Sequence, residues 1–192
     1  MGGHIAFNWS ALWVAGLTSM WTPYAGWAQV TSADDSTVET TVLPVYWDDR
    51  LGEHTEVAFH VPVFDSQPVI QKLFLVADRL SRFLFSYTPI EIIRIDTVGG
   101  RTIAKINLRG DSIGRPWSGR YFEGSSGGRC TTVALRKSFL QDGHRGLWVD
   151  GVRFFLNGEP ISDGWDHIFL AGVFYRKGSA PPGHRNHSES DY

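Results

Sequence analysis

Hydrophobic positions between residues 42 and 64 form short β-branched and aromatic runs. The runs at 42–47 and 57–64 are rich in Val, Phe and Tyr, which predicts two strands. Pro44 and Pro62 interrupt these runs and have no N–H group to donate to a neighbouring strand. We therefore expect both strands to lie at a sheet edge or to be locally irregular.

The clearest helix is predicted over about residues 67–86, where apolar residues recur at spacings of three and four. Ser66 is placed to cap this helix, Pro68 suits its first turn, and Pro89 marks the exit. We expect one apolar stripe of the helix to face the core. The stripe consists of Val69, Leu73, Val76, Leu80 and Phe83.

Two strands are predicted at 90–98 and 101–108, on either side of Gly99-Gly100. A diglycine between two runs of this kind is typical of a tight β-hairpin. Later runs at 152–156 and 168–174 have the composition of strands and complete the pattern.

A Gly- and Arg-rich loop at 109–128 leads into a second helix over about residues 126–141, with Ser125 or Ser126 as its cap. The order of elements is then strand, strand, helix, strand, strand, helix, strand, strand. This order predicts an α+β fold, with a small mixed or antiparallel sheet and both helices packed on one of its faces.

The start of the chain differs in composition from the rest. Residues 1–33 contain no Asp, Glu, Lys or Arg, and four of the eight tryptophans lie there. The apolar run from Ile5 suits the core of a signal peptide, and the small residues Gly26 and Ala28 suit cleavage after Ala28. The basic residues usual before such a run are missing, so an uncleaved membrane anchor and a buried apolar arm remain alternatives.

The composition along the chain predicts one folded domain. We interpret residues 1–28 as a signal peptide, the polar stretch 29–41 as a linker, and 42–176 as a single α+β domain. The tail at 177–192 has almost nothing to bury and is predicted to be disordered. The expected location is outside the cytoplasm, in the periplasm, at the cell surface or in the medium.

Charge and cysteine content exclude several classes of function. Eighteen Lys and Arg against twenty Asp and Glu give a net charge of −2, which argues against a nucleic-acid partner. Cys130 is the only cysteine, so neither an intramolecular disulfide nor a zinc site of several thiolates can form. No compact His and Asp spacing predicts a metal site, and no motif predicts a cofactor.

The order of elements also carries a family resemblance. The run Gly124-Ser125-Ser126-Gly127-Gly128 opens the second helix, and Gly158-Glu159-Pro160 follows a late strand. With these motifs, residues 42–175 resemble the GerMN domain family of spore germination proteins. The resemblance implies an exported, non-catalytic module that acts in the cell envelope by contacts with proteins or wall components. The chain lacks the lipobox cysteine of many relatives. The matching segments are Val57–Phe64, Ser66–Phe85, Ile90–Leu108, Gly124–Gln141 and Val152–Asn157.

The same glycine-rich run matches G-x-S-x-G, the pattern around the nucleophile of many serine hydrolases. Ser126 would be the nucleophile and His167 the base, with Asp150 or Asp163 orienting the base. A nucleophile elbow needs a buried strand before the serine, whereas residues 116–123 are polar and broken by glycine. A capped helix start is therefore the favoured interpretation, and a serine hydrolase is the alternative.

Aromatic and basic residues alternate in the loop before the second helix. Trp117 and Tyr121 flank Arg120, a combination that stacks on sugars or anchors protein partners. Arg129 lies near the N–H groups of the helix start, which favour anions. We expect Trp117, Arg120, Tyr121 and Arg129 to bind an envelope protein or a cell-wall glycan. The alternative is that the loop aromatics fold back over the sheet.

Overall fold

The computed structural model describes residues 39–48, 54–110 and 117–181. Within these residues the chain forms two sheets and two helices, which confirms the predicted α+β class. The predicted signal peptide, most of the predicted linker and the tail from residue 182 lie outside the described residues.

Strands β1 (Thr40–Asp48) and β2 (Thr55–Phe64) pair antiparallel and form a two-stranded sheet of their own. Both strands are therefore edge strands, as their prolines predicted. β1 also begins two residues earlier than expected, inside the stretch that we interpreted as linker.

The ladder between β1 and β2 explains where the prolines lie. The N–H of Asp65 donates to the Glu39 carbonyl at 3.0 Å, which makes these two residues a hydrogen-bonded pair. Because hydrogen-bonded and non-hydrogen-bonded pairs alternate in an antiparallel ladder, the pairs Val42–Pro62 and Pro44–His60 are non-hydrogen-bonded. The nitrogen of each proline thus points away from the partner strand, and no ladder bond is lost.

Helix α1 (Val69–Phe83) follows β2 and is shorter at both ends than predicted. Its N-cap residue is Pro68, with no side-chain cap, so the prediction that Ser66 caps the helix is wrong. The nearby Gln67 side chain instead accepts the N–H of Phe64 at 3.0 Å, which fixes the turn between β2 and α1.

The apolar stripe of α1 is confirmed except at its last position. Leu73, Val76 and Leu80 are completely buried, whereas the side chain of Phe83 is 62% exposed. Phe83 lies on the last turn, where its ring packs against Phe59 with the ring centroids 5.3 Å apart and under the Arg79 guanidinium, and most of it is in water. The helical period was correct, but the core ends one turn before the helix does.

The second sheet is mixed, with the strand order β3-β4-β5-β6 and β7 also paired with β5. β3 and β4 form the predicted hairpin, and Gly99 and Gly100 both have the positive φ angles that its two-residue turn requires. β4 and β5 run parallel. The five strands are β3 (Ile90–Val98), β4 (Arg101–Leu108), β5 (Gly151–Leu156), β6 (Glu159–Pro160) and β7 (Val173–Tyr175).

The last predicted strand, 168–174, is mostly a loop. Ile168 and Leu170 are buried as expected, but they anchor this loop in the core, and strand β7 begins only at Val173. The carbonyl of His167 approaches Gly128 so closely that a Cβ there would lie 2.6 Å from its oxygen. The apolar residues of this segment therefore pack it near the start of the second helix instead of extending the sheet.

Helix α2 (Ser125–Leu140) agrees with the prediction to within one residue at each end. Its N-cap residue is Gly124, which has a φ of 72° and offers no side chain. The prediction of a serine cap is therefore wrong, because Ser125 and Ser126 already belong to the first turn.

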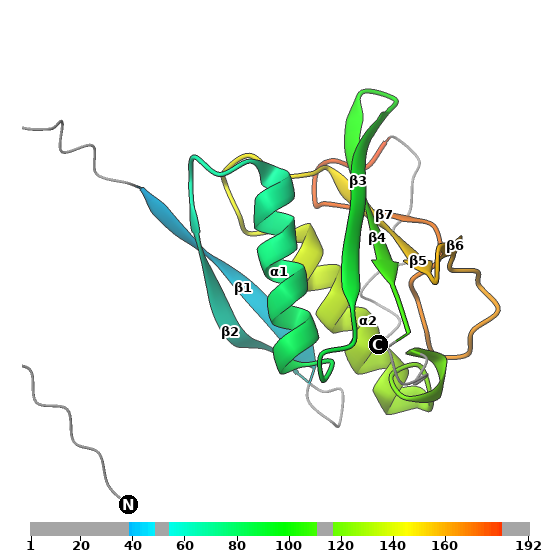
Figure 1. Ribbon diagram of the computed structural model, residues 1–192. Coiled ribbons are helices and arrows are strands. Elements are labelled where there is room, and N and C mark those ends of the chain that lie inside the picture. The colour runs from blue at the N-terminus through cyan, green and yellow to red at the C-terminus, as the bar shows by residue number, and fades with distance from the viewer. Residues whose placement is uncertain (1–38, 49–53, 111–116, 182–192) are drawn as a thin grey trace, which may run out of the picture. The chain divides into compact units, whose positions relative to one another are not determined.

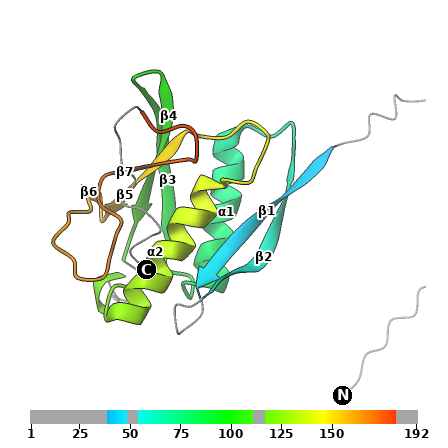
Figure 2. The same ribbon diagram turned by 180° about the vertical axis from the view of Figure 1, so that it is seen from behind.

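The helices lie between the two sheets (Figures 1 and 2). Both pack on one face of the mixed sheet, as predicted, and β1–β2 covers their other side. β1 runs along α2, where the N–H of Tyr46 donates to Ser138 Oγ at 2.9 Å. One turn further along, Gln141 Nε2 donates to the Pro44 carbonyl at 2.8 Å.

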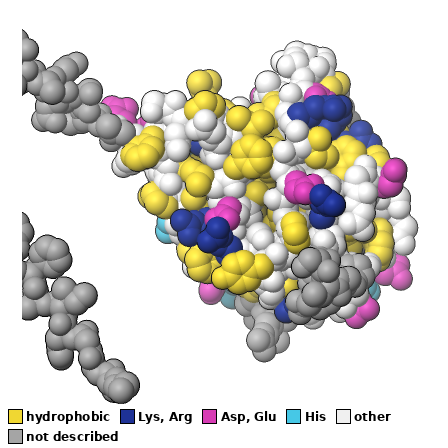
Figure 3. Space-filling view, viewed as in Figure 1, with side chains coloured by type: hydrophobic (Ala, Val, Ile, Leu, Met, Phe, Trp, Pro, Cys, Tyr) yellow, Lys and Arg dark blue, Asp and Glu magenta, His cyan; other side chains and the backbone are white. Residues whose placement is uncertain are grey.

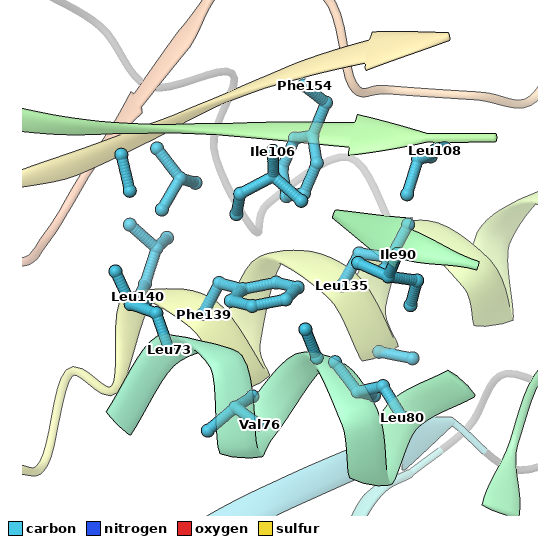
Figure 4. Close-up of a cluster of buried hydrophobic side chains, with 14 of the residues drawn as sticks. Leu73, Val76, Leu80, Ile90, Ile106, Leu108, Leu135, Phe139, Leu140 and Phe154 are labelled. Atoms are coloured by element: carbon cyan, nitrogen blue, oxygen red, sulfur yellow. The ribbon is translucent and has the colours of Figure 1, made fainter. Parts of the chain in front are cut away.

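The core forms where the inner sides of the helices meet the mixed sheet (Figure 4). Aliphatic and phenylalanine side chains from both helices and from three strands fill this layer. The residues labelled in Figure 4 are Leu73, Val76, Leu80, Ile90, Ile106, Leu108, Leu135, Phe139, Leu140 and Phe154.

Replacing Leu73 or Leu80 with Ala should lower the free energy of unfolding by about 2–5 kcal/mol, because each leaves a cavity in a fully packed core. Phe83→Ala, on the same helix, is the control and should cost less than about 1 kcal/mol, since most of its ring is in water. Urea unfolding followed by circular dichroism measures the difference. Equal losses at all three positions would contradict the assignment of the buried stripe.

Candidate functional site

Trp117, which we predicted as a contact residue, lies inside the protein. It opens the 3-10 helix η1 (Trp117–Gly119) and is completely buried. Its indole N–H donates to the Arg109 carbonyl at 2.8 Å, and its ring centroid lies 4.8 Å from that of Phe85. The prediction is therefore corrected for Trp117, since the aromatic side chain folds back against the core.

Arg120 and Tyr121 follow η1 and contact each other, with Arg120 at the surface and the Tyr121 hydroxyl buried. The Arg120 guanidinium lies over the Tyr121 ring, 5.2 Å from its centroid, and donates to Ser86 Oγ at 3.0 Å. Arg120 is exposed, while the half-buried Tyr121 ring packs edge-on against Phe85, with centroids 5.1 Å apart. The two residues are neighbours in the sequence, and their contacts with Ser86 and Phe85 fix the positions of both side chains.

Tyr87 belongs to the same surface and was missed by the sequence analysis. Its side chain is 73% exposed, and it follows Ser86, the residue that Arg120 contacts. Ser86 and Tyr87 have φ angles of 48° and 62°, so two consecutive non-glycine residues adopt the left-handed conformation. Helices commonly end with a glycine in the left-handed conformation, and no glycine follows α1 before Pro89. The sequence therefore indicated that another residue type would have to adopt a positive φ there.

Hydrogen bonds hold the strained turn after α1 in place. The N–H of Tyr87 donates to the Ser81 carbonyl at 2.8 Å, and Ser81 Oγ donates to the Thr88 carbonyl at 2.8 Å. We call Tyr87, Arg120 and Tyr121 the aromatic–arginine surface. Figure 3 shows hydrophobic side chains beside Lys and Arg side chains over the lower half of α1, the end from which this turn continues.

Arg129, the fourth predicted contact residue, contributes to the packing of β1 on α2. Its Nε donates to Asp48 Oδ2 at 3.1 Å, and the Asp48 side chain is almost completely buried. The adjacent Cys130 is also buried, with its Sγ 3.7 Å from the Asp48 carbonyl. Arg129 thus neutralises a buried carboxylate where β1 ends, and it is not part of the aromatic–arginine surface.

The residues of the hydrolase alternative are only partly brought together. Ser126 and His167 are both exposed, and the backbone of His167 lies against the first turn of α2. Within the described part of the chain, however, no hydrogen bond joins the two side chains. Asp163 is exposed in the same loop as His167.

Asp150 lies at the other end of the mixed sheet. Its carboxylate accepts hydrogen bonds from the N–H of Thr102 at 2.8 Å and from Thr102 Oγ1 at 2.9 Å. Thr102 is near the start of β4, whereas Arg109, which contacts Trp117, follows its end. Seven residues of extended strand, about 23 Å at about 3.3 Å per residue, separate these points. The Phe122 ring packs near both Trp117 and Trp165, and Trp165 lies in the loop that contains His167. Asp150 therefore lies at the far end of β4 from His167 and cannot orient it, so the structure does not assemble the Ser126–His167–Asp150 triad.

In residues 39–48, 54–110 and 117–181, no three His, Cys, Asp or Glu side chains gather as metal ligands. Nor does any helix of these segments have the length and hydropathy to cross a bilayer. Comparison with known proteins gave no match to a family model, a curated protein or a solved structure. The resemblance to GerMN domains therefore stays a hypothesis.

Asp150 predicts a specific dependence of stability on pH. The hydrogen bonds from Thr102 hold the pKa of Asp150 below its ordinary value of 3.8, in spite of partial burial. A carboxyl group with a lowered pKa in the folded state stabilises the fold fully above the unfolded-state pKa and loses this contribution as the pH falls through the folded-state pKa.

We therefore expect Asp150→Asn to lower the free energy of unfolding by about 1.5–3 kcal/mol at pH 7, as for a hydrogen bond to a charged group. The difference from the wild type should shrink below about pH 4. Urea unfolding from pH 7 to pH 2 measures it, with Asp163→Asn as an exposed control. A difference that is constant over this range would contradict the assigned role of the Asp150 carboxylate.

Proposed function

We propose that this protein is a non-catalytic module, exported to the cell envelope, that binds a protein or a cell-wall component through the aromatic–arginine surface. The observation that carries the proposal is the exposed ring of Tyr87, held in a strained backbone conformation directly after Ser86, the residue that Arg120 contacts. Export is supported by the uncharged start of the sequence and by the resemblance to GerMN domains.

The residue types of this surface suit binding. Tyrosine and arginine are enriched among the residues that dominate the energy of protein interfaces, and both also stack on sugar rings. Arg120 donates one N–H to Ser86 and has further N–H groups that can donate to a partner. Its contacts with Ser86 and Tyr121 already restrict the side chain, so a smaller loss of conformational entropy accompanies binding.

The backbone strain at Tyr87 is further support. A left-handed conformation at a bulky residue costs on the order of 1 kcal/mol, and such strain is found mainly where function requires it. Glycine at position 87 would adopt the same φ of 62° without this cost. A tyrosine therefore stands at a position where stability alone favours glycine.

The binding proposal is tested by recovering partners from an envelope fraction with the purified protein as bait. Tyr87→Gly removes the ring and relieves the strain, so the variant keeps its fold and we expect it to recover at least about tenfold less partner. Arg120→Ala should act in the same direction. Phe74→Ala, which removes a half-exposed ring from the first half of α1, is the matched control. Unchanged recovery with Tyr87→Gly would contradict the proposal.

The hydrolase alternative makes a different prediction for Ser126. A serine without a hydrogen-bonded base is not activated, so a fluorophosphonate probe should leave the purified protein unlabelled. Because Gly124 is the N-cap residue and the Ser126 hydroxyl caps nothing, Ser126→Ala should change the free energy of unfolding by less than about 0.5 kcal/mol. Labelling that disappears in Ser126→Ala would establish the hydrolase instead.

A further inference from the structure

A cleft of about 670 Å³ lies at the opposite ends of α1 and α2 from the aromatic–arginine surface. One wall is the first half of β1, including Val42 and Pro44. The second wall consists of Asp65, which precedes α1, and Lys72, which lies in the first turns of α1. The loop 143–147 after α2 forms the third wall.

Lys72 is a buried charge in this cleft. Its side chain is only 3% exposed, and its Nζ donates to the Asp65 carbonyl at 3.1 Å. An ammonium group has three protons, and no carboxylate forms an ion pair with Lys72 in the described part of the chain. Because buried charges are nearly always paired, a buried lysine that lines an open cleft favours an anionic ligand.

The other charges around the cleft are mainly positive. Arg145 is exposed at the loop wall, and Arg176 donates to the His144 carbonyl behind it. Asp65 is the one acidic residue of the described lining. The pKa of His144 lies below its ordinary value, first because of burial and then because of the positive charges of Lys72 and Arg176. A positive potential of this kind attracts anions.

The β1 wall of the cleft is an unpaired strand edge. Val42, like Pro44, belongs to a non-hydrogen-bonded pair of the β1–β2 ladder. The N–H and C=O groups of Val42 therefore point away from β2. No hydrogen bond to the Val42 backbone occurs within the described residues, whereas the Pro44 carbonyl on the same edge accepts from Gln141. The edge is therefore open at Val42, before α2 covers it, and an open edge position of this kind can pair with the main chain of an extended segment.

We propose that the cleft binds an extended acidic peptide segment. The main chain of the peptide pairs with Val42 on the edge of β1, and one of its carboxylates lies next to Lys72, with Arg145 on the loop wall. The strand edge favours a peptide over a free anion, because a free anion would use Lys72 and leave Val42 without a partner. This site is separate from the aromatic–arginine surface and does not depend on the function proposed there.

The probe is a peptide of alternating Thr and Val with one central Glu and both ends blocked, compared with the same peptide carrying Gln and with inorganic phosphate. Binding is followed by the amide shifts of the isotope-labelled protein. We expect the Glu peptide to bind at least about tenfold more tightly than the Gln peptide, as for a charge-assisted contact. The largest shifts should fall at Val42 and in the loop 143–147.

Three variants separate the two parts of the site. Lys72→Met keeps the length of the side chain and removes the charge, so the preference for Glu over Gln should disappear. Val42→Pro deletes an N–H that faces away from β2, as the natural prolines of this sheet do, and should weaken both peptides alike. Lys105→Met removes a lysine that is paired with Asp96 on the mixed sheet and should leave binding unchanged. Thermal unfolding verifies that each variant is folded.

The proposal is overturned if neither peptide shifts the cleft residues. It is overturned equally if both peptides bind alike to the wild type, or if the preference for Glu survives in Lys72→Met. Phosphate binding that requires Lys72, without peptide binding, would show a simple anion site instead. Peptide binding that depends on both Lys72 and Val42 supports the proposal.

Discussion

The packing of β1 on α2 is the contact on which the cleft of the molecule depends. A two-stranded sheet is at best marginally stable in water by itself, so β1–β2 needs this helix. Hydrogen bonds from Tyr46 and Gln141 and the ion pair of Asp48 with Arg129 join the two elements along their length. Because β1 and α2 run in opposite directions, this contact fixes the cleft at one end of α2, while the aromatic–arginine surface lies near the other.

Local patterns predicted the elements well, and the contacts between distant elements less well. The 90–108 hairpin could be predicted directly, since a diglycine determines the turn and the register next to it, although a bulge between Ile92 and Arg94 shifts the register further along. The separate β1–β2 sheet could not be deduced, because pairing between strands and packing across layers depend on residues far apart in sequence. The cap errors have a similar cause: Ser66 and Ser126 suit a cap, but the backbone begins each helix at another residue.

The sequence predicted only some of the residues that form the two candidate sites. A loop aromatic such as Trp117 has the same sequence signature whether it faces solvent or core, and only its contacts distinguish the two. Arg120 and Tyr121 were within reach because they are neighbours in the chain. The burial of Lys72 could have been predicted from its spacing in the helix. Lys72 lies three residues after Val69 and four before Val76, so the helical period places a charge on the buried stripe.

The parallel pairing of β4 with β5 has a consequence for how the chain folds. β5 lies between β4 and the short strands β6 and β7, so the last part of the domain to be synthesised supplies an inner strand of the sheet. The two hairpins close short loops, whereas β5 joins β4 only after the whole crossover with α2 has been made. A nascent chain that ends before Gly151 leaves one edge of β4 unpaired. Completion of the mixed sheet therefore waits for the synthesis of β5, and until then the apolar face of β4 and the helices is incompletely covered, as in folding intermediates that are prone to aggregate.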